Sequence, residues 1–348
     1  MNIHEKYIKR CIELAKNGLG KTYPNPMVGS VIVLNDSIIG EGWHQKAGEP
    51  HAEVNAINSV KDKTLLSKAT IYVSLEPCSH YGKTPPCANL IVEKGIKNVV
   101  IGSIDTNSVV SGRGVKHLIA NGCNVIVGVL EDECEELNKR FFTFHSKKRP
   151  YIMLKWAETS DGFIDKLRGK NVKQSPNWIS NSYSQQYVHK MRSDEQAILV
   201  GTTTALNDNP SLNVRSWVGI NPIRIVLDRT LKIPKNYNLY DESVQTIVFT
   251  ETQMNSSINK NVYFEIVNFN KNLIEQICTI LFNYEIQSII IEGGSKTLQS
   301  FINENLWDEA FIFVGDIAFK TGLKAPKMIK APILIQKIST DALKIYRN

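Results

Sequence analysis

Two short stretches in the first half of the chain carry side chains that can hold a metal ion and move protons. The first, Gly-Glu-Pro-His-Ala-Glu, contains His51 and Glu53, and the second contains Cys78 and Cys87, each directly after a proline. One imidazole and two thiolates give zinc three ligands and leave its fourth position for a water molecule, whose pKa the metal lowers. Glu53 is expected to carry the proton of that water rather than to bind the metal. The set therefore predicts a hydrolytic zinc site.

The local sequence places each candidate ligand at the end of an element. His51 follows a proline at an expected helix start, Cys78 ends an expected strand, and Cys87 opens the next helix. A thiolate at a helix N-terminus is electrostatically favoured. The order His-x-Glu followed by Pro-Cys is the signature of zinc deaminases that act on nucleobases. We therefore predict a zinc-dependent deaminase of a pyrimidine-like ring.

Two other interpretations of these cysteines stay open. In a closed structural zinc site, His80 would be the fourth ligand, but such a site has no need of the His-Ala-Glu helix start. A packing role is disfavoured because Cys78 and Cys87 lie in a loop of turn residues. The remaining cysteines have helix-like or strand-like surroundings and are expected to be packing residues without disulfides, namely Cys11, Cys123, Cys134 and Cys278.

The composition limits the class of protein. Hydrophobic residues make up 42% and charged residues 22% of the chain, as in ordinary globular proteins. No long apolar run appears, and charges interrupt the first residues, so we expect a cytoplasmic enzyme with no membrane span or signal peptide. The net charge of +7 comes from scattered Lys and Arg without a basic block. We therefore expect no nucleic-acid partner, whereas a mildly basic surface suits a phosphorylated small molecule.

The length of 348 residues predicts two domains, which we place at 1–146 and 147–348. In the first domain the later strand-helix-strand units predict a sheet with helices on both faces, and Asn35-Asp36 predicts a hairpin turn. Residues 131–147 predict one connecting helix, with acids at its start and bases at its end. Strands are expected near 28–34, 37–43, 70–76, 98–104 and 124–129, and helices from about His4, His51, Pro86 and Gly114.

The second domain also alternates strands and helices, so both domains are predicted to be α/β. Its strongest signal is a strand that ends in Glu292-Gly-Gly and leads into a helix at Ser295. Glycines let the backbone approach a ligand, and a helix start offers N–H groups to a phosphate. A plain strand-to-helix turn is the alternative. Strands are expected near 151–162, 196–201, 222–228, 245–250, 263–269 and 288–294, and further helices near 181–193 and 271–283.

The first half resembles one deaminase family in particular. Eight residues separate Cys78 from Cys87, where zinc deaminases usually have two, and Pro-Asn-Pro-Met-Val-Gly stands at 24–29. With Gly-Trp-His-Gln-Lys-Ala-Gly-Glu-Pro-His-Ala-Glu at 42–53, the chain resembles the bifunctional deaminase–reductases of riboflavin biosynthesis. The resemblance covers nearly the whole chain. It implies a cytidine-deaminase-like α/β/α sandwich followed by a dihydrofolate-reductase-like α/β domain.

The resemblance also implies the deaminase substrate, 2,5-diamino-6-ribosylamino-4(3H)-pyrimidinone 5′-phosphate, whose 2-amino group water would replace. It assigns Asn25 and His44 to the substrate and Lys83 to its phosphate. It further assigns Asp105 and Asn107, although this loop has Asp-Thr-Asn-Ser where the family has Asp-Pro-Asn-Pro. The alternatives are a turn role for Asn25 and a solvated loop lysine for Lys83.

Three stretches of the second half, 154–162, 196–215 and 222–229, resemble the reductase half of the same family. The reaction implied is hydride transfer from NADPH to C1 of the ring-opened ribose. The resemblance assigns the cofactor site to Ala157, Trp178, Thr204, Asp208, Arg229, Gly294, Ser295, Lys296, Thr297, Leu298, Gln299 and Ser300. It assigns substrate binding to Arg192, Leu212, Arg215 and Glu292, with Lys155 and Glu292 as candidates for an acid or base.

Simple chemistry supports some of these assignments. Guanidinium forks suit a phosphate, which favours Arg192 and Arg215 as its ligands. Arg229 would meet the 2′-phosphate that distinguishes NADPH from NADH, or it is an exposed arginine at a strand end. Asp208, which stands before Asn209 and a proline, has a turn as its alternative role.

Two segments depart from the family pattern. Residues 170–178 lack the usual serine before Trp178, and residues 314–325 carry no family motif. One alternative therefore keeps the deaminase and gives the C-terminal half an altered or lost reductase function. Others are a nucleic-acid-editing deaminase and a zinc-stabilised binding module. The leading hypothesis is a bifunctional enzyme with one zinc ion, NADPH and a phosphorylated pyrimidine substrate, assembled as a homodimer or homotetramer as the resemblance implies.

Overall fold

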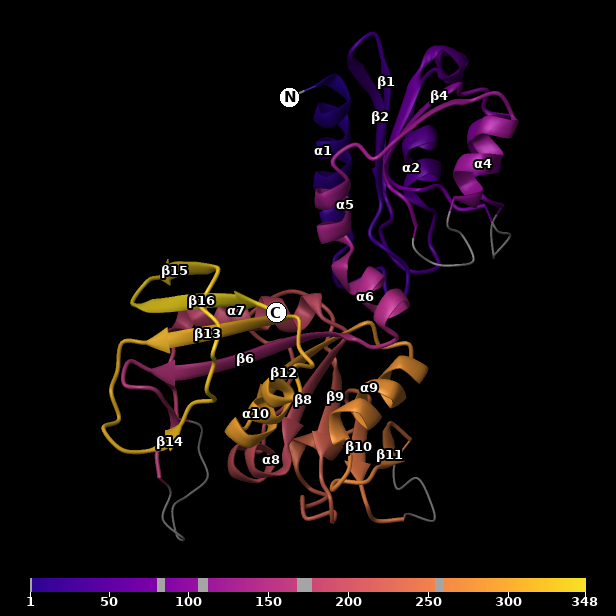
Figure 1. Cartoon of the computed structure of the whole chain (residues 1–348). Helices are drawn as coiled ribbons and strands as arrows, with labels where there is room; N and C mark the ends of the chain where they lie inside the picture. Colours follow the sequence, from indigo (N-terminus) through magenta and orange to yellow (C-terminus); the bar gives the residue numbers. More distant parts are fainter. Residues whose placement is uncertain (1, 80–84, 106–111, 168–176, 254–259) are drawn as a thin grey trace. The chain divides into compact units, whose positions relative to one another are not determined.

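The computed structural model describes residues 2–79, 85–105, 112–167, 177–253 and 260–348. The chain divides into two compact units, Met1–Lys148 and Arg149–Asn348, which are drawn in Figure 1. None of the helices within the described ranges combines the length and the apolar character that crossing a membrane requires. All six cysteines are free, and Cys11, Cys123, Cys134 and Cys278 are buried, as expected of packing residues.

The first unit is built on a five-stranded sheet with the order β2-β1-β3-β4-β5. β1 pairs antiparallel with β2 and β3, whereas β3, β4 and β5 are parallel. The hairpin turns at Asn35 (φ 47°) and Asp36 (φ 59°), as predicted, with the backbone that a two-residue turn requires. The strands are β1 (Gly29–Leu34), β2 (Ser37–Trp43), β3 (Thr70–Leu75), β4 (Asn98–Ser103) and β5 (Asn124–Val127).

Helices cover both faces of this sheet, which confirms the predicted α/β/α sandwich (Figure 1). Alternate strand residues face opposite cores: Tyr72 and Val100 pack with α1 and α5, and Ile71 and Ile101 pack with α2, α3 and α4. The helices are α1 (Ile3–Ala15), α2 (Ala52–Ser59), α3 (Cys87–Glu93), α4 (Arg113–Ala120), α5 (Glu131–Leu137) and α6 (Lys139–Lys147), with 3₁₀ helices η1 (Lys16–Gly18) and η2 (Lys63–Lys68).

The prediction of one helix over residues 131–147 is wrong. The segment forms two helices, α5 and α6, which are separated at Asn138, where φ is −106° and ψ is 22°. The Asn138 side chain accepts the Met27 N–H at 2.8 Å and donates to the Met27 carbonyl oxygen at 2.9 Å. An asparagine side chain that bonds a distant backbone competes with helix continuation. A tertiary contact, which the local pattern does not encode, therefore decides where the helix breaks.

The second unit contains a nine-stranded sheet with the order β11-β10-β9-β8-β12-β6-β13-β16-β15. Neighbouring strands from β11 to β13 are parallel, whereas β16 pairs antiparallel with β13 and β15. The strands are β6 (Tyr151–Thr159), β8 (Ala197–Gly201), β9 (Ile223–Leu227), β10 (Thr246–Thr250), β11 (Val262–Ile266), β12 (Ser288–Gly293), β13 (Glu309–Gly315), β15 (Leu334–Ile338) and β16 (Asp341–Arg347). A separate ribbon pairs β7 (Phe163–Asp165) with β14 (Leu323–Lys324).

Helices again cover both faces, so this unit has the predicted α/β class. α9 and α10 pack in one core and α7 and α8 in the other. These helices are α7 (Ser182–Asp194), α8 (Thr202–Asp208), α9 (Leu273–Asn283) and α10 (Ser295–Asn303), with η3 at Asn238–Tyr240. The neighbouring parallel strands β8 and β12 lead directly into α8 and α10, so the starts of these two helices meet at one edge of the sheet. In α/β sheets this carboxyl edge is where ligands bind.

Candidate functional site

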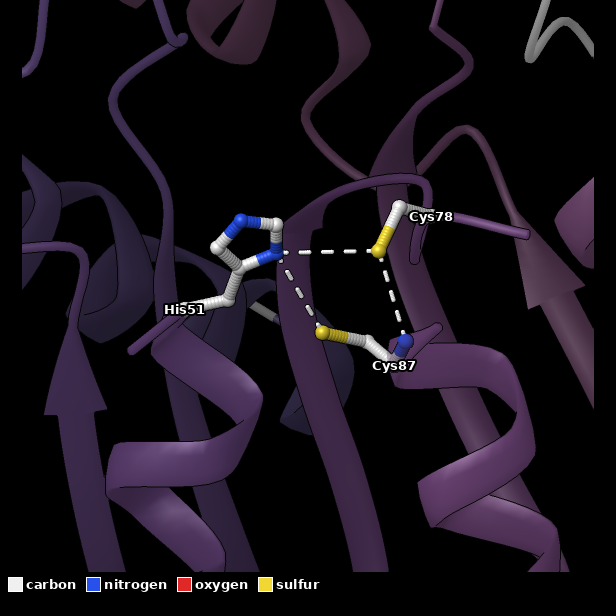
Figure 2. Close-up of side chains that lie close together, drawn as sticks. All are labelled: His51, Cys78 and Cys87. Carbon is white, nitrogen blue, oxygen red and sulfur yellow. Dashed lines mark hydrogen bonds between the residues drawn. The ribbon is translucent and has the colours of Figure 1, made fainter. Parts of the chain in front are cut away.

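Three side chains of the first unit surround one point: His51 before α2, Cys78 after β3 and Cys87 at the start of α3 (Figure 2). His51 Nδ1 lies 3.6 Å from Cys78 Sγ and 3.4 Å from Cys87 Sγ. Tetrahedral zinc with its usual bond lengths keeps nitrogen and sulfur ligands about 3.6 Å apart. The donor set and its spacing therefore fit zinc. Among the described residues, no second group of three His, Cys, Asp or Glu ligand atoms comes as close together.

The first turn of α3 holds the Cys78 sulfur in place. The Cys87 N–H donates to Cys78 Sγ at 3.3 Å, and the Ala88 N–H donates to the Cys78 carbonyl oxygen at 3.1 Å. The pKa of the Cys78 thiol lies well below its ordinary value, because the Cys87 side chain, and to a smaller extent His51, hydrogen-bond to it. The same pairing, together with burial, raises the pKa of the Cys87 thiol.

Glu53 lies in the first turn of α2 and is 3% exposed. Burial raises the pKa of its carboxyl to about 7, and the nearby Cys78 adds to the shift. Its side chain also hydrogen-bonds with Cys87, although it does not belong to the ligand group. A buried carboxyl with this pKa can accept and release a proton near neutral pH.

Asn25 and His44 reach the same site from separate loops. His44 Nδ1 lies 3.2 Å from the Pro50 carbonyl oxygen, and its Nε2 lies 3.1 Å from Asn25 Nδ2. Because a carbonyl oxygen only accepts, Nδ1 donates, and in a neutral ring Nε2 accepts from the Asn25 amide. Burial lowers the pKa of His44, which favours this neutral form. The rings of His44 and His51 meet edge to face with 5.3 Å between their centroids.

Of the remaining residues predicted for this site, Asp105 is among the described residues. Asp105 is buried after β4, and its N–H donates to Glu76. Lys83, Asn107 and the alternative ligand His80 lie outside the described residues.

Sequence reasoning missed Glu76 and Asn138 as supporting residues of the first site. Glu76 stands directly before Pro77-Cys78, and its carboxylate accepts several backbone N–H groups. Asn138 holds the backbone of Met27, two residues after Asn25. An acid beside a ligand motif and an asparagine inside a helical pattern were the only local signals for these roles.

A second cluster of charged side chains lies at the carboxyl edge of the sheet in the second unit. Arg192 from α7 donates to both carboxylate oxygens of Glu292 at the end of β12, at 3.1 and 2.7 Å. Lys155 Nζ on β6 lies 3.9 Å from the same carboxylate. Burial alone would raise the pKa of Glu292, but Arg192 and Lys155 outweigh it and bring this pKa to about 2. Burial lowers the pKa of Lys155.

The segment 212–215 adds two more of the predicted residues to this cluster. Leu212 is buried, and the carbonyl oxygen of Asn213 accepts from Arg192 at 3.2 Å. The N–H of Arg215 donates to Nδ1 of His189 at 3.2 Å. Burial, together with the nearby arginines, lowers the pKa of His189 to about 4, so the ring is neutral and can accept this bond. The structure thus gathers Lys155, Arg192, Leu212, Arg215 and Glu292 around one place.

The predicted cofactor residues of 294–300 form the start of α10. Gly294 is the N-cap of this helix and makes no side-chain cap, so its first N–H groups suit a phosphate. A Cβ on Gly294 would lie 3.1 Å from Thr204 Oγ1 on α8, and one on Gly201 would lie 2.5 Å from Thr297 Oγ1. The two helix starts therefore approach closely, with small side chains between them. This arrangement fits the pyrophosphate of a dinucleotide.

The other predicted cofactor residues lie on β6, at the end of α8, beside the end of β13 and after β9. Ala157 is on β6, and Asp208 ends α8. Trp178 is 63% exposed and precedes Ile179, whose carbonyl oxygen packs against Gly315 at the end of β13. Arg229 follows β9, where its Nε donates to Glu251 at 2.7 Å.

Comparison with known proteins adds independent information. Residues 1–103 match the cytidine and deoxycytidylate deaminase zinc-binding region, and residues 150–320 match the RibD C-terminal domain. The riboflavin biosynthesis protein RibD of Aquifex aeolicus is 40% identical over 328 residues, which are 92% of this chain and 89% of that protein. The chain belongs to the RibD family. RibD of Escherichia coli is 34% identical over 327 residues, 89% of this chain and 87% of that protein.

A solved RibD-type structure has the same fold. The diaminohydroxyphosphoribosylaminopyrimidine deaminase/5-amino-6-(5-phosphoribosylamino)uracil reductase of Thermotoga maritima is 39% identical, with a TM-score of 0.88 over 99% of this chain and 98% of that chain. The cytidine-deaminase-like first domain and the dihydrofolate-reductase-like second domain are thereby confirmed. As a RibD protein, the chain is a bifunctional deaminase and reductase of riboflavin biosynthesis that uses zinc and NADPH. The match over 150–320 includes residues 170–178 and most of 314–325, the two segments that depart from the family pattern. The comparisons therefore do not favour a chain that has kept only the deaminase activity.

Proposed function

We propose that the first unit deaminates 2,5-diamino-6-ribosylamino-4(3H)-pyrimidinone 5′-phosphate at the site formed by His51, Cys78 and Cys87. The observation that supports this most is the buried carboxyl of Glu53 beside a His/Cys/Cys donor set. Zinc, when bound by these three ligands, lowers the pKa of water so that hydroxide is available near neutral pH. A closed site with four protein ligands would leave no position for water.

In this reaction Glu53 moves the proton. Its carboxylate takes a proton from water, delivers it to the ring nitrogen, and later assists the departure of the 2-amino group as ammonia, so that the water oxygen replaces that group. Asn25, His44 and Asp105 hold the pyrimidine, and Lys83 binds the phosphate. The neutral tautomer of His44 fixes which way the Asn25 amide faces, so the pair presents one defined pattern to the ring.

The second unit, in this proposal, transfers hydride from NADPH to C1 of the ring-opened ribose and yields a ribityl product. Residues 294–300 receive the pyrophosphate at the start of α10, with Ala157, Trp178, Thr204, Asp208 and Arg229 along the same cofactor site. Arg215 binds the substrate phosphate. The fork of Arg192 is already bonded to Glu292, so Arg192 contributes by orienting that carboxylate. Leu212 and Lys155 complete the substrate site.

The test of the deaminase site is Glu53→Gln, which keeps the size of the side chain and removes its proton-carrying group. Ammonia release from the pyrimidinone phosphate should fall by at least about a hundredfold, the usual contribution of a general acid–base. The bound zinc should stay at one ion per chain. Retained ammonia release in the zinc-loaded variant would exclude Glu53 as the proton carrier. His117→Gln, a change on α4 outside the site, is the control.

We also propose that the enzyme is a cytoplasmic homodimer or homotetramer. The outer strand β15 exposes Leu334 and Ile335, which are 49% and 61% exposed, as a strand that meets a second copy would. Light scattering on the purified protein measures the assembly, and a single-chain mass would exclude it. Cell fractionation tests the location, and recovery outside the cytoplasmic fraction would contradict it.

A further inference from the structure

Glu76 is a buried acid that the proposed chemistry does not use. It directly follows β3 and precedes Pro77 and the predicted zinc ligand Cys78, and it is 4% exposed. Its own N–H donates to the Ser103 carbonyl oxygen at 3.0 Å, which joins the carboxyl ends of the parallel strands β3 and β4. A carboxylate at such a position needs partners, because burying an unpaired charge is costly.

The partners of the Glu76 carboxylate are four backbone N–H groups. Oε2 accepts from Asp105 at 3.3 Å and from Gly112 at 2.9 Å. Oε1 accepts from Gly114 at 2.8 Å and from Val115 at 3.2 Å. The first two donors flank residues 106–111 in the sequence, and the last two belong to the first turn of α4. One carboxylate therefore holds both the predicted substrate residue Asp105 and the start of α4.

A close approach between α4 and the loop of Cys78 accompanies these bonds. A Cβ on Gly114 would lie 2.1 Å from the Pro77 carbonyl oxygen, so only glycine allows the first turn of α4 to come this near. Pro77 connects Glu76 to Cys78. The segment that carries the zinc ligand and the segment that carries Asp105 are thus fixed to each other through one residue.

We infer that Glu76 is a positioning residue of the deaminase site, which sets the place of Asp105 relative to Cys78 without touching the substrate. The inference rests on the proposed deamination and adds to it a determinant of substrate binding. Asp105 is proposed to hold the pyrimidine, while Cys78 belongs to the site where water is activated. Holding Asp105 in place relative to Cys78 therefore sets how tightly the pyrimidine is bound beside the reacting water.

The test is Glu76→Gln in the full-length, zinc-loaded enzyme. The amide keeps one oxygen but directs an NH₂ group at two N–H donors, so one half of the bonding pattern is lost and becomes repulsive. We expect the KM for the pyrimidinone phosphate to rise about tenfold or more, because bonds of about 1 kcal/mol each that hold Asp105 and the start of α4 are lost. We expect kcat per bound zinc to stay within about threefold, because Glu53 and the zinc ligands are unchanged.

The matched control is Asp228→Asn in the second unit. Asp228 is also a fully buried acid just after a parallel strand, and its two oxygens accept the N–H groups of Lys232 and Ile233 at 2.9 Å each. The same carboxyl-to-amide change there should leave the KM of deamination unaltered. A KM for Glu76→Gln equal to that of the unmodified enzyme, with activity lost only in proportion to zinc, would overturn the inference.

Two further measurements cover the case in which Glu76→Gln does not fold. Gly114→Ala keeps the carboxylate and pushes the first turn of α4 away from Pro77, so it should raise the KM in the same way. Hydrogen exchange on the unmodified enzyme should show slow exchange at the amides of Asp105, Gly112, Gly114 and Val115. Fast exchange at all four amides would overturn the inference without any variant. Failure of the unmodified enzyme to release ammonia would instead refute the proposed function, and the exchange result would still stand.

Discussion

Glu292 shows how a carboxylate stays ionised in a buried place. Burial opposes its charge, but the two bonds from Arg192 and the nearby Lys155 bring its pKa to about 2. Because this pKa is lower in the folded than in the unfolded protein, the ionised carboxylate stabilises the fold at pH values above its ordinary pKa of 4.5. That stabilisation is lost as the pH falls from about 4.5 towards 2.

Glu292→Gln should lower the free energy of unfolding of the second unit. At pH 7 the variant should be less stable by an amount of the order of 3 kcal/mol, because it leaves two buried cations without a counter-charge. The difference from the unmodified protein should shrink below pH 4.5. Urea unfolding at several pH values, followed by a probe in the second unit, measures it. A pH-independent difference would contradict the proposed ionisation.

His189 supports Arg215 through one hydrogen bond to its backbone. Its neutral Nδ1 accepts the N–H of Arg215, which is proposed to bind the substrate phosphate. His189→Leu removes the acceptor and should raise the KM of the reductase reaction about three- to tenfold, the effect of one lost buried hydrogen bond. His189→Asn offers an oxygen near the position of Nδ1 and should restore most of the affinity. Equal KM values for the two variants would argue against this role.

The break between α5 and α6 depends on the side chain of Asn138. Asn138→Ala removes both bonds to the Met27 backbone and leaves a buried N–H and a buried carbonyl without partners. We expect the first unit to lose about 2–3 kcal/mol of stability. Thermal or urea unfolding measures the change. Asn124→Ala, which removes an exposed bond to Asn98, is the matched control and should change the stability by less than about 0.5 kcal/mol.

Most elements could be predicted from the sequence because their patterns are local. The alternating and apolar runs give β1 to β6 and β8 to β12 nearly at their observed bounds, and the Asn35-Asp36 turn follows from backbone preference. The helix break at Asn138 could not be predicted, since its cause lies at Met27, far away in the chain. β13, β15 and β16 were also missed, although Glu309–Gly315 is almost entirely apolar.

The candidate sites show the same limit. The spacing of His51, Cys78 and Cys87 predicts a common site because each type is a zinc ligand and each stands at the end of an element. The bond between Arg192 and Glu292 could not be foreseen, because α7 and β12 meet only in the folded sheet. The role of Glu76 was missed for the same reason, since its four donors come from later segments.

At the scale of the whole molecule, the two activities have different metal requirements. Removal of zinc by a chelator should abolish ammonia release, because the His/Cys/Cys donor set lies in the first unit. Oxidation of NADPH with the already deaminated product should persist, since the second unit does not share that site. Parallel assays of ammonia and of nicotinamide absorbance, before and after restoring zinc, measure both. Loss of both activities on chelation would contradict the separate assignment.

The central place of β6 has a consequence for how the protein is made. β6 is the first strand of the second unit, yet Met153 pairs with Ile290 on β12 and with Glu309 on β13. During synthesis the middle of this sheet must therefore wait until nearly the whole chain has left the ribosome. Pairings so distant in sequence form slowly and leave apolar strand edges open in the meantime. The first unit, complete by Lys148, can fold long before, so the nascent chain passes through a stage with one folded half and one whose central strands are still unpaired.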